Sequence, residues 1–371
     1  DLKKPLAGTL KTRSGLKISP AALTKNIMNN NTRKDRMYEK PFHKENLSTF
    51  TFLVTGGAGF IGSNIVEYLV KYGAGKIKIL DNLSTGFLHN IEPFLSLPNV
   101  EFINGDICDT ETCEIACKDV DYILHQAALG SVPRSIKDPQ ATNKSNVDGF
   151  LNMLVAAKNN NIRRFVFASS SSVYGDSTQL PKTENNIGNP LSPYAVSKHV
   201  NELYARVFSK CYGLNIVGLR YFNVYGPNQS PTGAYAAAIP LFIHALLTQH
   251  SPKIYGDGEQ TRDFTFVENA VQANIKAAFT QKPDVSGEIF NIACGDKTSV
   301  NDLFILLKTI SNSSIAPTYV DERQGDIRDS LADITHAKNM LGYEPETKTP
   351  EGLKITFAWF EQNFKRLYEL D

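Results

Sequence analysis

The sequence predicts an α/β fold in which a doubly wound parallel sheet carries a smaller C-terminal lobe. Three observations lead to this prediction. From residue 51 onward, short apolar segments of strand length alternate with longer segments of helical periodicity. A glycine-rich turn joins the first strand to the first helix, and the second strand ends in an acidic residue, Asp81. Together these features are typical of a Rossmann sheet.

The strand segments are short, apolar and rich in β-branched or aromatic residues. They are 50–56, 76–81, 100–106, 120–128, 163–170, 214–226 and 288–295. Helical periodicity is expected between them, at 63–73, 146–160 and 194–208. Strands that alternate with helices at this spacing form right-handed units, so we expect one parallel sheet.

The chain divides into three parts by composition. Residues 1–46 are rich in Lys, Arg, Asn and Thr without sustained apolar periodicity, and we expect a flexible N-terminal extension. Residues 47–225 with 262–293 are expected to form the Rossmann domain. The loop-rich segments 226–261 and 294–371 are expected to form the smaller lobe, over the carboxyl ends of the strands.

Composition argues against several classes of partner. The chain has 371 residues, with 39 Lys and Arg against 38 Asp and Glu, so we expect no nucleic acid and no membrane as a partner. The apolar runs are too short to span a bilayer, and five cysteines fit a reducing compartment, so a cytoplasmic location is expected. Cys108, Cys113 and Cys117 match no common zinc spacing, and we expect no metal.

The glycine-rich turn is a candidate site for a dinucleotide. Gly57, Gly59 and Gly62 satisfy the pattern G-x-G-x-x-G, and Gly56 with Gly59 and Gly62 satisfies G-x-x-G-x-x-G. Without side chains, a pyrophosphate can approach the backbone at the helix N-terminus, where N–H groups point at it. The alternative, a glycine turn without a ligand, is disfavoured by the strand before it and the helix after it.

Two acidic residues extend this candidate site. Asp81 ends the second strand, where a carboxylate accepts hydrogen bonds from the ribose hydroxyls of adenosine. It would repel a 2′-phosphate, and residues 82–86 carry no Arg or Lys to attract one. NAD is therefore favoured over NADP as the cofactor. Asp106 ends the third strand, where adenine is expected.

The stretch SPYAVSK, residues 192–198, places Tyr194 and Lys198 four positions apart, on one helix face. A common alternative is an ordinary tyrosine beside a surface lysine. However, strand 163–170 ends in serines at the edge of the sheet where a nicotinamide would lie. A free phenol has a pKa near 10, and two neighbouring cations, Lys198 and the oxidised nicotinamide, would lower it. The phenolate could then take a proton from a sugar hydroxyl.

These motifs have a family resemblance. The glycine turn, LDNLSTG, GDI, HQAA, NVDG, SSSSVYG, SPYAVSK and RYFNVYG occur in an order that resembles the extended short-chain dehydrogenase/reductase family. Within it, the chain resembles the nucleotide-sugar 4-epimerases, from about Leu53 to Tyr343. The resemblance implies tightly held NAD and a lobe that binds UDP.

The resemblance also implies site residues. The cofactor residues are expected to be Gly56, Gly59, Phe60, Ile61, Gly62, Asp81, Asn82, Ser84, Thr85, Gly86, Asp106, Ile107, Gln126, Ala127, Ala128, Asn146, Tyr194, Lys198 and Tyr221. The substrate residues are expected to be Ser131, Arg134, Ser170, Ser171, Ser172, Asn223, Ala238, Tyr255, Arg262, Arg323, Asp326 and Ser330.

The family pattern assigns Tyr194, Lys198 and Ser170 to catalysis, with the Ser170 hydroxyl bonded to the reacting oxygen. Ser171 and Ser172 compete for that bond. Related dehydratases and decarboxylases carry an acidic residue at the position of Ser172, so the serine favours oxidation and re-reduction at a single carbon. By the same pattern, the diphosphate contacts are Asn223, Arg262 and Arg323, with Asp326 at the uridine ribose and Tyr255 beside the uracil.

One departure from the pattern bears on the sugar. Galactose-restricted epimerases carry a bulky aromatic where this chain has Ser330, and a small residue leaves room for a 2-acetamido group. HQAALGSVPRSI resembles the N-acetylhexosamine epimerases of bacterial surface-polysaccharide pathways, so we expect interconversion of UDP-N-acetylglucosamine and UDP-N-acetylgalactosamine. UDP-glucose and UDP-galactose are further candidates. Ser131 and Arg134 would help to read the sugar, and Arg134 matters most if C6 is a carboxylate.

Alternative functions remain open at this point. UDP-hexuronic or UDP-N-acetylhexosaminuronic acids are alternative substrates. A nucleotide-sugar dehydratase or decarboxylase, or a catalytically silent NAD-sensing module, are less favoured readings. The family also suggests a homodimer through a four-helix interface, to which residues 194–213 could contribute a helix.

Overall fold

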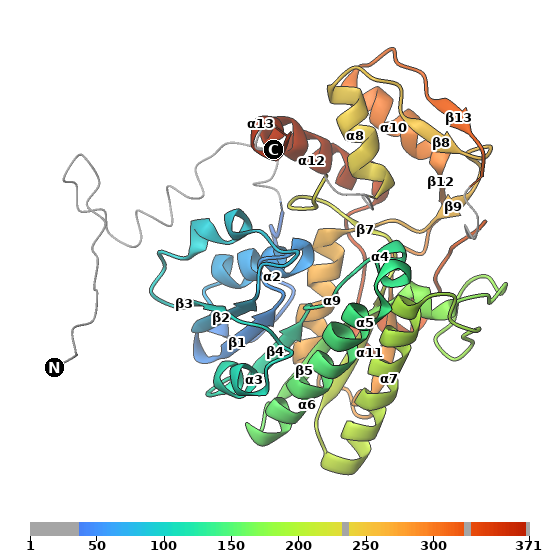
Figure 1. Ribbon diagram of the computed structural model, residues 1–371. Coiled ribbons are helices and arrows are strands. Elements are labelled where there is room, and N and C mark those ends of the chain that lie inside the picture. The colour runs from blue at the N-terminus through green and yellow to red at the C-terminus, as the bar shows by residue number, and fades with distance from the viewer. Residues whose placement is uncertain (1–36, 232–236, 323–327, 369–371) are drawn as a thin grey trace, which may run out of the picture.

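The computed structural model describes residues 37–231, 237–322 and 328–368. In these ranges a central sheet has helices on both faces, and a smaller lobe lies beyond one end of its strands (Figure 1). None of the helices in the described ranges is long and apolar enough to cross a bilayer.

The central sheet has seven strands in the order β11-β6-β5-β4-β1-β2-β3, and every neighbouring pair is parallel. The strands are β1 (Thr51–Thr55), β2 (Lys76–Asp81), β3 (Val100–Asn104), β4 (Tyr122–His125), β5 (Arg164–Ser170), β6 (Ile216–Tyr221) and β11 (Glu288–Ile292). This order confirms the predicted doubly wound fold. It reverses between β1 and β4, where ligands of such sheets bind at the carboxyl ends.

Helices cover both faces of the sheet. They are α2 (Phe60–Lys71), α9 (Val267–Phe279) and α11 (Thr335–Leu341) on one face, and α3 (Thr110–Cys117), α6 (Gly149–Asn159) and α7 (Pro193–Tyr212) on the other. Alternate residues of β1 enter different cores: Phe52 and Val54 pack in the core that contains α2 and α9, and Leu53 in the core that contains α3 and α6. A strand buried on both faces is apolar throughout, as the sequence shows.

Short elements connect the strands and the longer helices. They are η2 (Leu47–Thr49), η3 (Leu88–Asn90), η4 (Glu92–Phe94), α4 (Val132–Lys137), α5 (Pro139–Asn143), the π-helical turn η5 (Lys144–Asp148) and η6 (Ser171–Tyr174). The lobe comprises α8 (Ala238–Leu247), β8 (Lys253–Tyr255), β9 (Thr261–Arg262), β12 (Thr298–Ser299), α10 (Val300–Ser311), β13 (Thr318–Val320), α12 (Thr349–Gln362) and α13 (Phe364–Tyr368). Its small ladders pair β8 with β13 and β9 with β12, while β7 (Val224–Tyr225) pairs with β10 (Thr265–Phe266).

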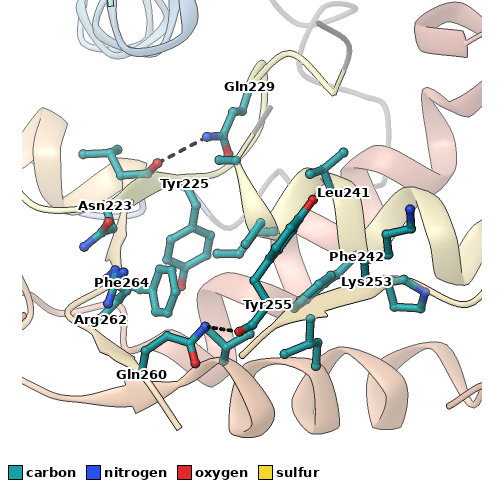
Figure 2. Close-up of a pocket in the computed structure, with 17 residues that line it drawn as sticks. Asn223, Tyr225, Gln229, Leu241, Phe242, Lys253, Tyr255, Gln260, Arg262 and Phe264 are labelled. Carbon is teal, nitrogen blue, oxygen red and sulfur yellow. Dashed lines mark hydrogen bonds between the residues drawn. The ribbon is translucent and has the colours of Figure 1, made fainter. Parts of the chain in front are cut away.

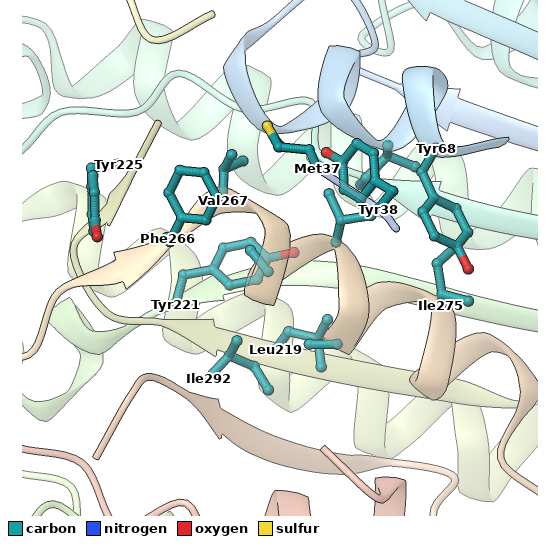
Figure 3. Close-up of a cluster of buried hydrophobic side chains, with 14 of the residues drawn as sticks. Met37, Tyr38, Tyr68, Leu219, Tyr221, Tyr225, Phe266, Val267, Ile275 and Ile292 are labelled. Carbon is teal, nitrogen blue, oxygen red and sulfur yellow. The ribbon is translucent and has the colours of Figure 1, made fainter. Parts of the chain in front are cut away.

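The predicted flexible extension covers residues 1–46, of which 1–36 lie outside the described residues, and the prediction is wrong for the segment from residue 37. Met37 and Tyr38 are 2% and 1% exposed and lie in the core beside Tyr68 of α2 (Figure 3). The Tyr38 hydroxyl donates to the carbonyl of Asn64 at 3.2 Å, and its backbone N–H donates to Glu268 of α9. These contacts join α2 to α9, so the segment is part of the Rossmann domain.

The predicted boundary at residue 294 also needs a correction. Helix α11 packs against β11 and α9 instead of joining the lobe. The ring of His336 stacks on Phe290 of β11 with centroids 4.6 Å apart, and Leu341 is buried. The chain after residue 294 therefore returns to the Rossmann domain once before α12.

Candidate active site

The glycine turn between β1 and α2 is built for close approach. A Cβ on Gly62 would lie 2.1 Å from the carbonyl oxygen of Gly56, and Gly56 itself has a φ of +65°. Gly59 is the N-cap of α2 and provides no side-chain hydrogen bond to the first N–H groups. These N–H groups face the turn at the positive end of the helix dipole, which suits the pyrophosphate of a dinucleotide.

Asp81 lies beside this turn, at the end of β2. Its carboxylate accepts hydrogen bonds from the backbone N–H groups of Ala58 at 3.0 Å and Leu83 at 2.8 Å. Burial raises the pKa of Asp81, and the backbone hydrogen bonds act in the opposite direction. A Cβ on Gly86 would lie 2.9 Å from Oδ2 of Asp81, so the loop after β2 closes on the carboxylate. A carboxylate in this place can accept hydrogen bonds from the hydroxyls of an adenosine ribose, and residues 82–86 carry no Arg or Lys that would bind a 2′-phosphate.

A cavity of about 470 Å³ runs from the glycine turn to Tyr194. Every predicted cofactor residue except Asn146 lines it, together with Ser170, Arg134 and Asn223. Sequence reasoning missed some neighbours of the motif residues, namely Leu80, Gly105, Leu129, Gly130, Ser145, Ala168, Ser169 and Val224. Most of them adjoin a motif position in the chain, so the strand ends were a signal that could have found them.

Asn146 lies behind the cavity wall. Its side-chain amide accepts from the N–H of Leu129 at 2.7 Å and donates to the Leu129 carbonyl at 3.2 Å. It also donates to the Ser197 hydroxyl on α7 at 3.1 Å. Asn146 therefore joins the loop after β4 to the helix that carries Tyr194, and it acts on the site through these neighbours.

Gln126 and Tyr221 line the cavity and are joined by hydrogen bonds. The Tyr221 hydroxyl donates to Oε1 of Gln126 at 3.1 Å and accepts from Nδ2 of Asn274 at 2.7 Å. Nε2 of Gln126 donates to Oδ1 of Asn274 at 3.0 Å, which closes the triangle. A closed set of hydrogen bonds fixes these side chains, because each buried polar group has a partner.

Tyr194 and Lys198 lie one turn apart on α7. The helix begins as its sequence indicates: the Ser192 hydroxyl caps the N–H of Ala195 at 3.1 Å, and Pro193 is the first helical residue. Nζ of Lys198 donates to the carbonyl of Ala168 on β5 at 2.8 Å and lies 5.9 Å from the centre of the Tyr194 ring. The two groups therefore share one end of the cavity.

Burial shifts both titrating groups. It raises the pKa of Tyr194, and a hydrogen bond with the Ser170 hydroxyl acts in the opposite direction. Burial lowers the pKa of Lys198 to about 8, against the carboxylate of Glu202. In the protein alone the phenol is thus protonated at neutral pH. A further positive charge beside the ring, which an oxidised nicotinamide has, would favour the phenolate.

Of the four serines that follow Ala168 at the end of β5, two line the cavity and two do not. Ser169 and Ser170 line the cavity, and Oγ of Ser170 accepts the N–H of Ser172 at 3.1 Å. The chain leaves the strand at Ser171 and enters η6, so the structure does not bring Ser171 and Ser172 to the cavity lining. The Ser172 hydroxyl is buried and has no hydrogen-bond partner within the described residues.

A second cavity of about 510 Å³ adjoins the first, since Asn223 and Val224 line both. The predicted substrate residues Ala238, Tyr255 and Arg262 line it. Figure 2 shows Asn223 and Arg262 at one end and the Tyr255 ring beside Leu241 and Phe242. The second cavity therefore has polar groups at the end next to the first cavity and apolar walls in the lobe.

Asp263 ties this end of the lobe to the sheet. Its carboxylate accepts from the backbone N–H groups of Cys294 at 2.9 Å, Gly295 at 3.1 Å and Ala332 at 3.2 Å. Its carbonyl accepts from Nδ2 of Asn223 at 3.0 Å. Burial raises the pKa of Asp263 to about 7, against these backbone hydrogen bonds. Because Asp263 follows Arg262 in the chain and bonds Asn223, its hydrogen bonds hold both of these cavity residues in position.

Of four further predicted substrate residues, two line neither cavity and two lie outside the described residues. Ser330 is half-buried, and its N–H donates to the carbonyl of Thr261 at 3.1 Å, next to Arg262, without lining either cavity. Ser131 caps α4, where its hydroxyl accepts the N–H of Arg134 at 3.3 Å. Arg323 and Asp326 lie outside the described residues, so their predicted contacts stay predictions.

Arg134 lines the cavity that contains Tyr194 and Lys198, from α4, and is half-buried. Within the described residues its guanidinium has no carboxylate partner. In the same ranges, no group of three or more His, Cys, Asp and Glu side chains could hold a metal ion.

Comparisons with known proteins agree with this geometry. A family model described as the NAD dependent epimerase/dehydratase family matches residues 52–293. The chain is 42% identical over 313 residues to a putative UDP-glucose 4-epimerase of Methanocaldococcus jannaschii, covering 84% of this chain and 98% of that protein.

Solved structures of nucleotide-sugar epimerases are also similar to this chain. A UDP-N-acetylglucosamine 4-epimerase of Methanobrevibacter ruminantium, in complex with UDP-N-acetylmuramic acid, is 43% identical with a TM-score of 0.80, over 85% of this chain and 99% of that chain. A UDP-glucose 4-epimerase of Thermotoga maritima with UDP-glucose is 37% identical with a TM-score of 0.79, over 85% and 99%.

Proposed function

The chain belongs to the NAD dependent epimerase/dehydratase family, with NAD as its cofactor, and we propose that it interconverts UDP-N-acetylglucosamine and UDP-N-acetylgalactosamine at C4. The main support for this proposal is that the two cavities adjoin, with Asn223 and Val224 lining both. Tyr194, Lys198 and Ser170 share one cavity with the glycine turn, and at Asn223 that cavity opens into a second one, which Arg262 lines. A sugar joined to a nucleoside diphosphate would span that junction, with the sugar near Tyr194 and the nucleotide in the lobe.

Each catalytic residue has a defined task. The phenolate of Tyr194 takes the proton of the sugar 4-hydroxyl and later returns it, while the Ser170 hydroxyl donates to the reacting oxygen. The ammonium of Lys198 stabilises the phenolate, and the Ala168 carbonyl holds that ammonium in place. NAD, when bound on the glycine turn, supplies the two-electron acceptor for oxidation at C4 and returns the same electrons.

Inversion at C4 requires the keto sugar to present its other face. A firm hold on UDP and a looser hold on the sugar permit this rotation. Arg262 and Tyr255 supply candidates for the firm hold in the lobe. By the family pattern, dehydratases and decarboxylases carry an acidic residue at the position of Ser172, and its absence from this chain favours simple epimerisation.

The acetamido substrate is supported by two features. Ser330, whose N–H bonds the carbonyl next to Arg262, stands by the family pattern where galactose-restricted epimerases carry a bulky aromatic, and its small side chain would leave room for a 2-acetamido group. The solved relative from Methanobrevibacter ruminantium, at 43% identity, is a UDP-N-acetylglucosamine 4-epimerase.

A second candidate substrate is an acidic UDP-sugar. It is favoured by Arg134, whose guanidinium lines the catalytic cavity without a carboxylate partner in the described ranges. A carboxylate on the sugar would pair with it.

The test is a panel of UDP-sugars incubated with purified protein and no added cofactor, followed by proton NMR. We expect UDP-N-acetylgalactosamine to give UDP-N-acetylglucosamine with no net change in NAD. A keto-deoxy product or released carbon dioxide would contradict the proposal. Ser330→Tyr should lose acetamido substrates and keep UDP-galactose turnover, and equal loss of both would exclude its role in specificity.

We also propose a homodimer built on α7. Val196, Leu203 and Val207 recur on one face of this helix and are 49%, 48% and 50% exposed, although they are apolar. A second copy of the same helix would cover this stripe. Light scattering should show a dimer for the native protein and a monomer for Leu203→Glu; a monomeric native protein would refute the proposal.

A further inference from the structure

A buried ionic cluster lies behind the proposed catalytic residues and joins α7 to β5 and β6. We propose that Glu202, held by Arg220 and Ser169, is a positioning residue that keeps Lys198 in its charged form. The inference rests on the proposed function, because it concerns the ammonium that catalysis there requires.

The cluster is closed and almost free of solvent. Glu202 and Arg220 are 2% and 1% exposed. Nε of Arg220 donates to Oε1 of Glu202 at 2.8 Å, and Nη2 donates to Oε2 at 2.7 Å. The Ser169 hydroxyl donates to Oε1 at 2.5 Å. Both carboxylate oxygens are therefore engaged, and the side chain has one fixed position.

Stability alone does not account for such a cluster. Removing two charges from water is costly, and packed apolar residues of similar volume often replace a buried ion pair without loss of stability. The position of the cluster suggests another purpose. Glu202 lies one helical turn beyond Lys198, Ser169 directly precedes Ser170, and Arg220 directly precedes Tyr221. Each member thus adjoins a residue that lines the catalytic cavity.

Lys198 needs a compensating charge. It is 3% exposed, and burial lowers its pKa to about 8, while Glu202 acts in the opposite direction. Its ammonium donates a hydrogen bond to the neutral carbonyl of Ala168. His125 on β4 also faces it, but burial and then the charge of Lys198 lower the pKa of that imidazole to about 3, so it is neutral.

Within the part of the chain that the structure describes, the other elements packed against α7 offer no comparable carboxylate. Arg220 reaches Glu202 from β6, and the Tyr174 hydroxyl of η6 accepts from Nη1 of Arg220 at 3.1 Å. Arg134 of α4 is half-buried and positive. The further charged residues of α4, α5, η5 and α6 are exposed, namely Lys137, Asp138, Lys144, Asp148 and Lys158.

The main variant is the double substitution Glu202→Gln with Arg220→Gln. It removes both charges while leaving amides that can hydrogen-bond, which avoids an unpaired buried guanidinium. We expect the alkaline limb of the pH profile of kcat to move to lower pH by about 1 unit, the smaller end of what a neighbouring opposite charge produces. Glu202→Asp should keep the limb near its native position.

A matched control separates charge from packing. Arg164 is a buried guanidinium at the opposite end of β5, where it donates to the carbonyls of Ala277 and Thr280, each at 2.9 Å. Arg164→Gln should lower stability and leave the alkaline limb unchanged. If it moves the limb as far as the double variant does, the cluster has no specific effect on Lys198.

A second measurement does not depend on catalysis. The pH dependence of acetylation of Lys198 by acetic anhydride, followed by mass spectrometry, reports when its amine loses its proton. We expect the midpoint to fall by about 1 pH unit in the double variant. An unchanged midpoint in a folded double variant overturns the inference. If the native protein epimerises no UDP-sugar while this midpoint still moves, the proposed function fails and the charge effect stands.

Discussion

The substitution Gly62→Ala tests the glycine turn as the place where NAD binds. The added Cβ would lie 2.1 Å from the carbonyl oxygen of Gly56 and 2.8 Å from the Cα of Gly57. Both neighbours are backbone atoms, so rotation of a side chain cannot relieve the overlap. The turn or the start of α2 must move by roughly 1 Å, and misplacement on that scale can weaken a positioned interaction by about 100-fold.

We therefore expect Gly62→Ala to lose most of its NAD. The assay compares the NAD that remains with the purified protein after gel filtration, and the concentration of added NAD that restores epimerisation. Gly213→Ala is the control: Gly213 ends α7 with a φ of +68° and nothing lies within 4 Å of its added Cβ, so only backbone strain is introduced. If Gly62→Ala retains as much NAD as Gly213→Ala, this turn does not bind the pyrophosphate.

Three further perturbations test other parts of the account. Asp81→Asn should weaken NAD binding about tenfold or more, measured by calorimetry, since a hydrogen bond to a charged group is lost. Because burial raises the pKa of Asp81, the affinity of the native protein for NAD should also fall as the pH decreases, at a higher pH than for an ordinary aspartate. An affinity that does not change with pH would contradict this. Lys198→Met should lower kcat by about 100-fold while NAD binding persists, and an unchanged kcat would exclude a catalytic role for the ammonium. Tyr38→Ala should reduce the free energy of unfolding in urea by about 3–5 kcal/mol, against less than about 0.5 kcal/mol for exposed Lys40→Ala; equal effects would show that the segment from residue 37 is not part of the core.

Local patterns account for the parts of the fold that the sequence predicted well. The apolar runs around Phe52 and Val166 are strands buried on both faces, and their spacing indicated the parallel sheet. Local patterns also account for the parts of the candidate site that the sequence predicted. The glycine turn depends on neighbours within a few positions, and Tyr194 with Lys198 depends on one helical turn, so both were visible without the structure.

The parts that sequence reasoning missed depend on distant contacts. Tyr38 is held by Glu268, 230 positions away, and nothing near Tyr38 in the chain indicates that partner. Asn146 belongs to a cofactor motif, yet its partners Leu129 and Ser197 place it behind the cavity wall. Ser172 shares a run of serines with Ser170, but the change from strand to helical turn at Ser171 separates them. Residue type alone does not reveal such changes of direction.

The substitution Tyr194→Phe tests the central claim most directly, because it removes one oxygen atom and leaves the ring that packs above Lys198. The measurement is the rate at which the purified variant equilibrates UDP-N-acetylglucosamine with UDP-N-acetylgalactosamine, followed by proton NMR alongside its NAD content. We expect the variant to keep NAD and to lose interconversion by at least about 100-fold, since the proton acceptor is gone. Interconversion at the native rate would contradict the account.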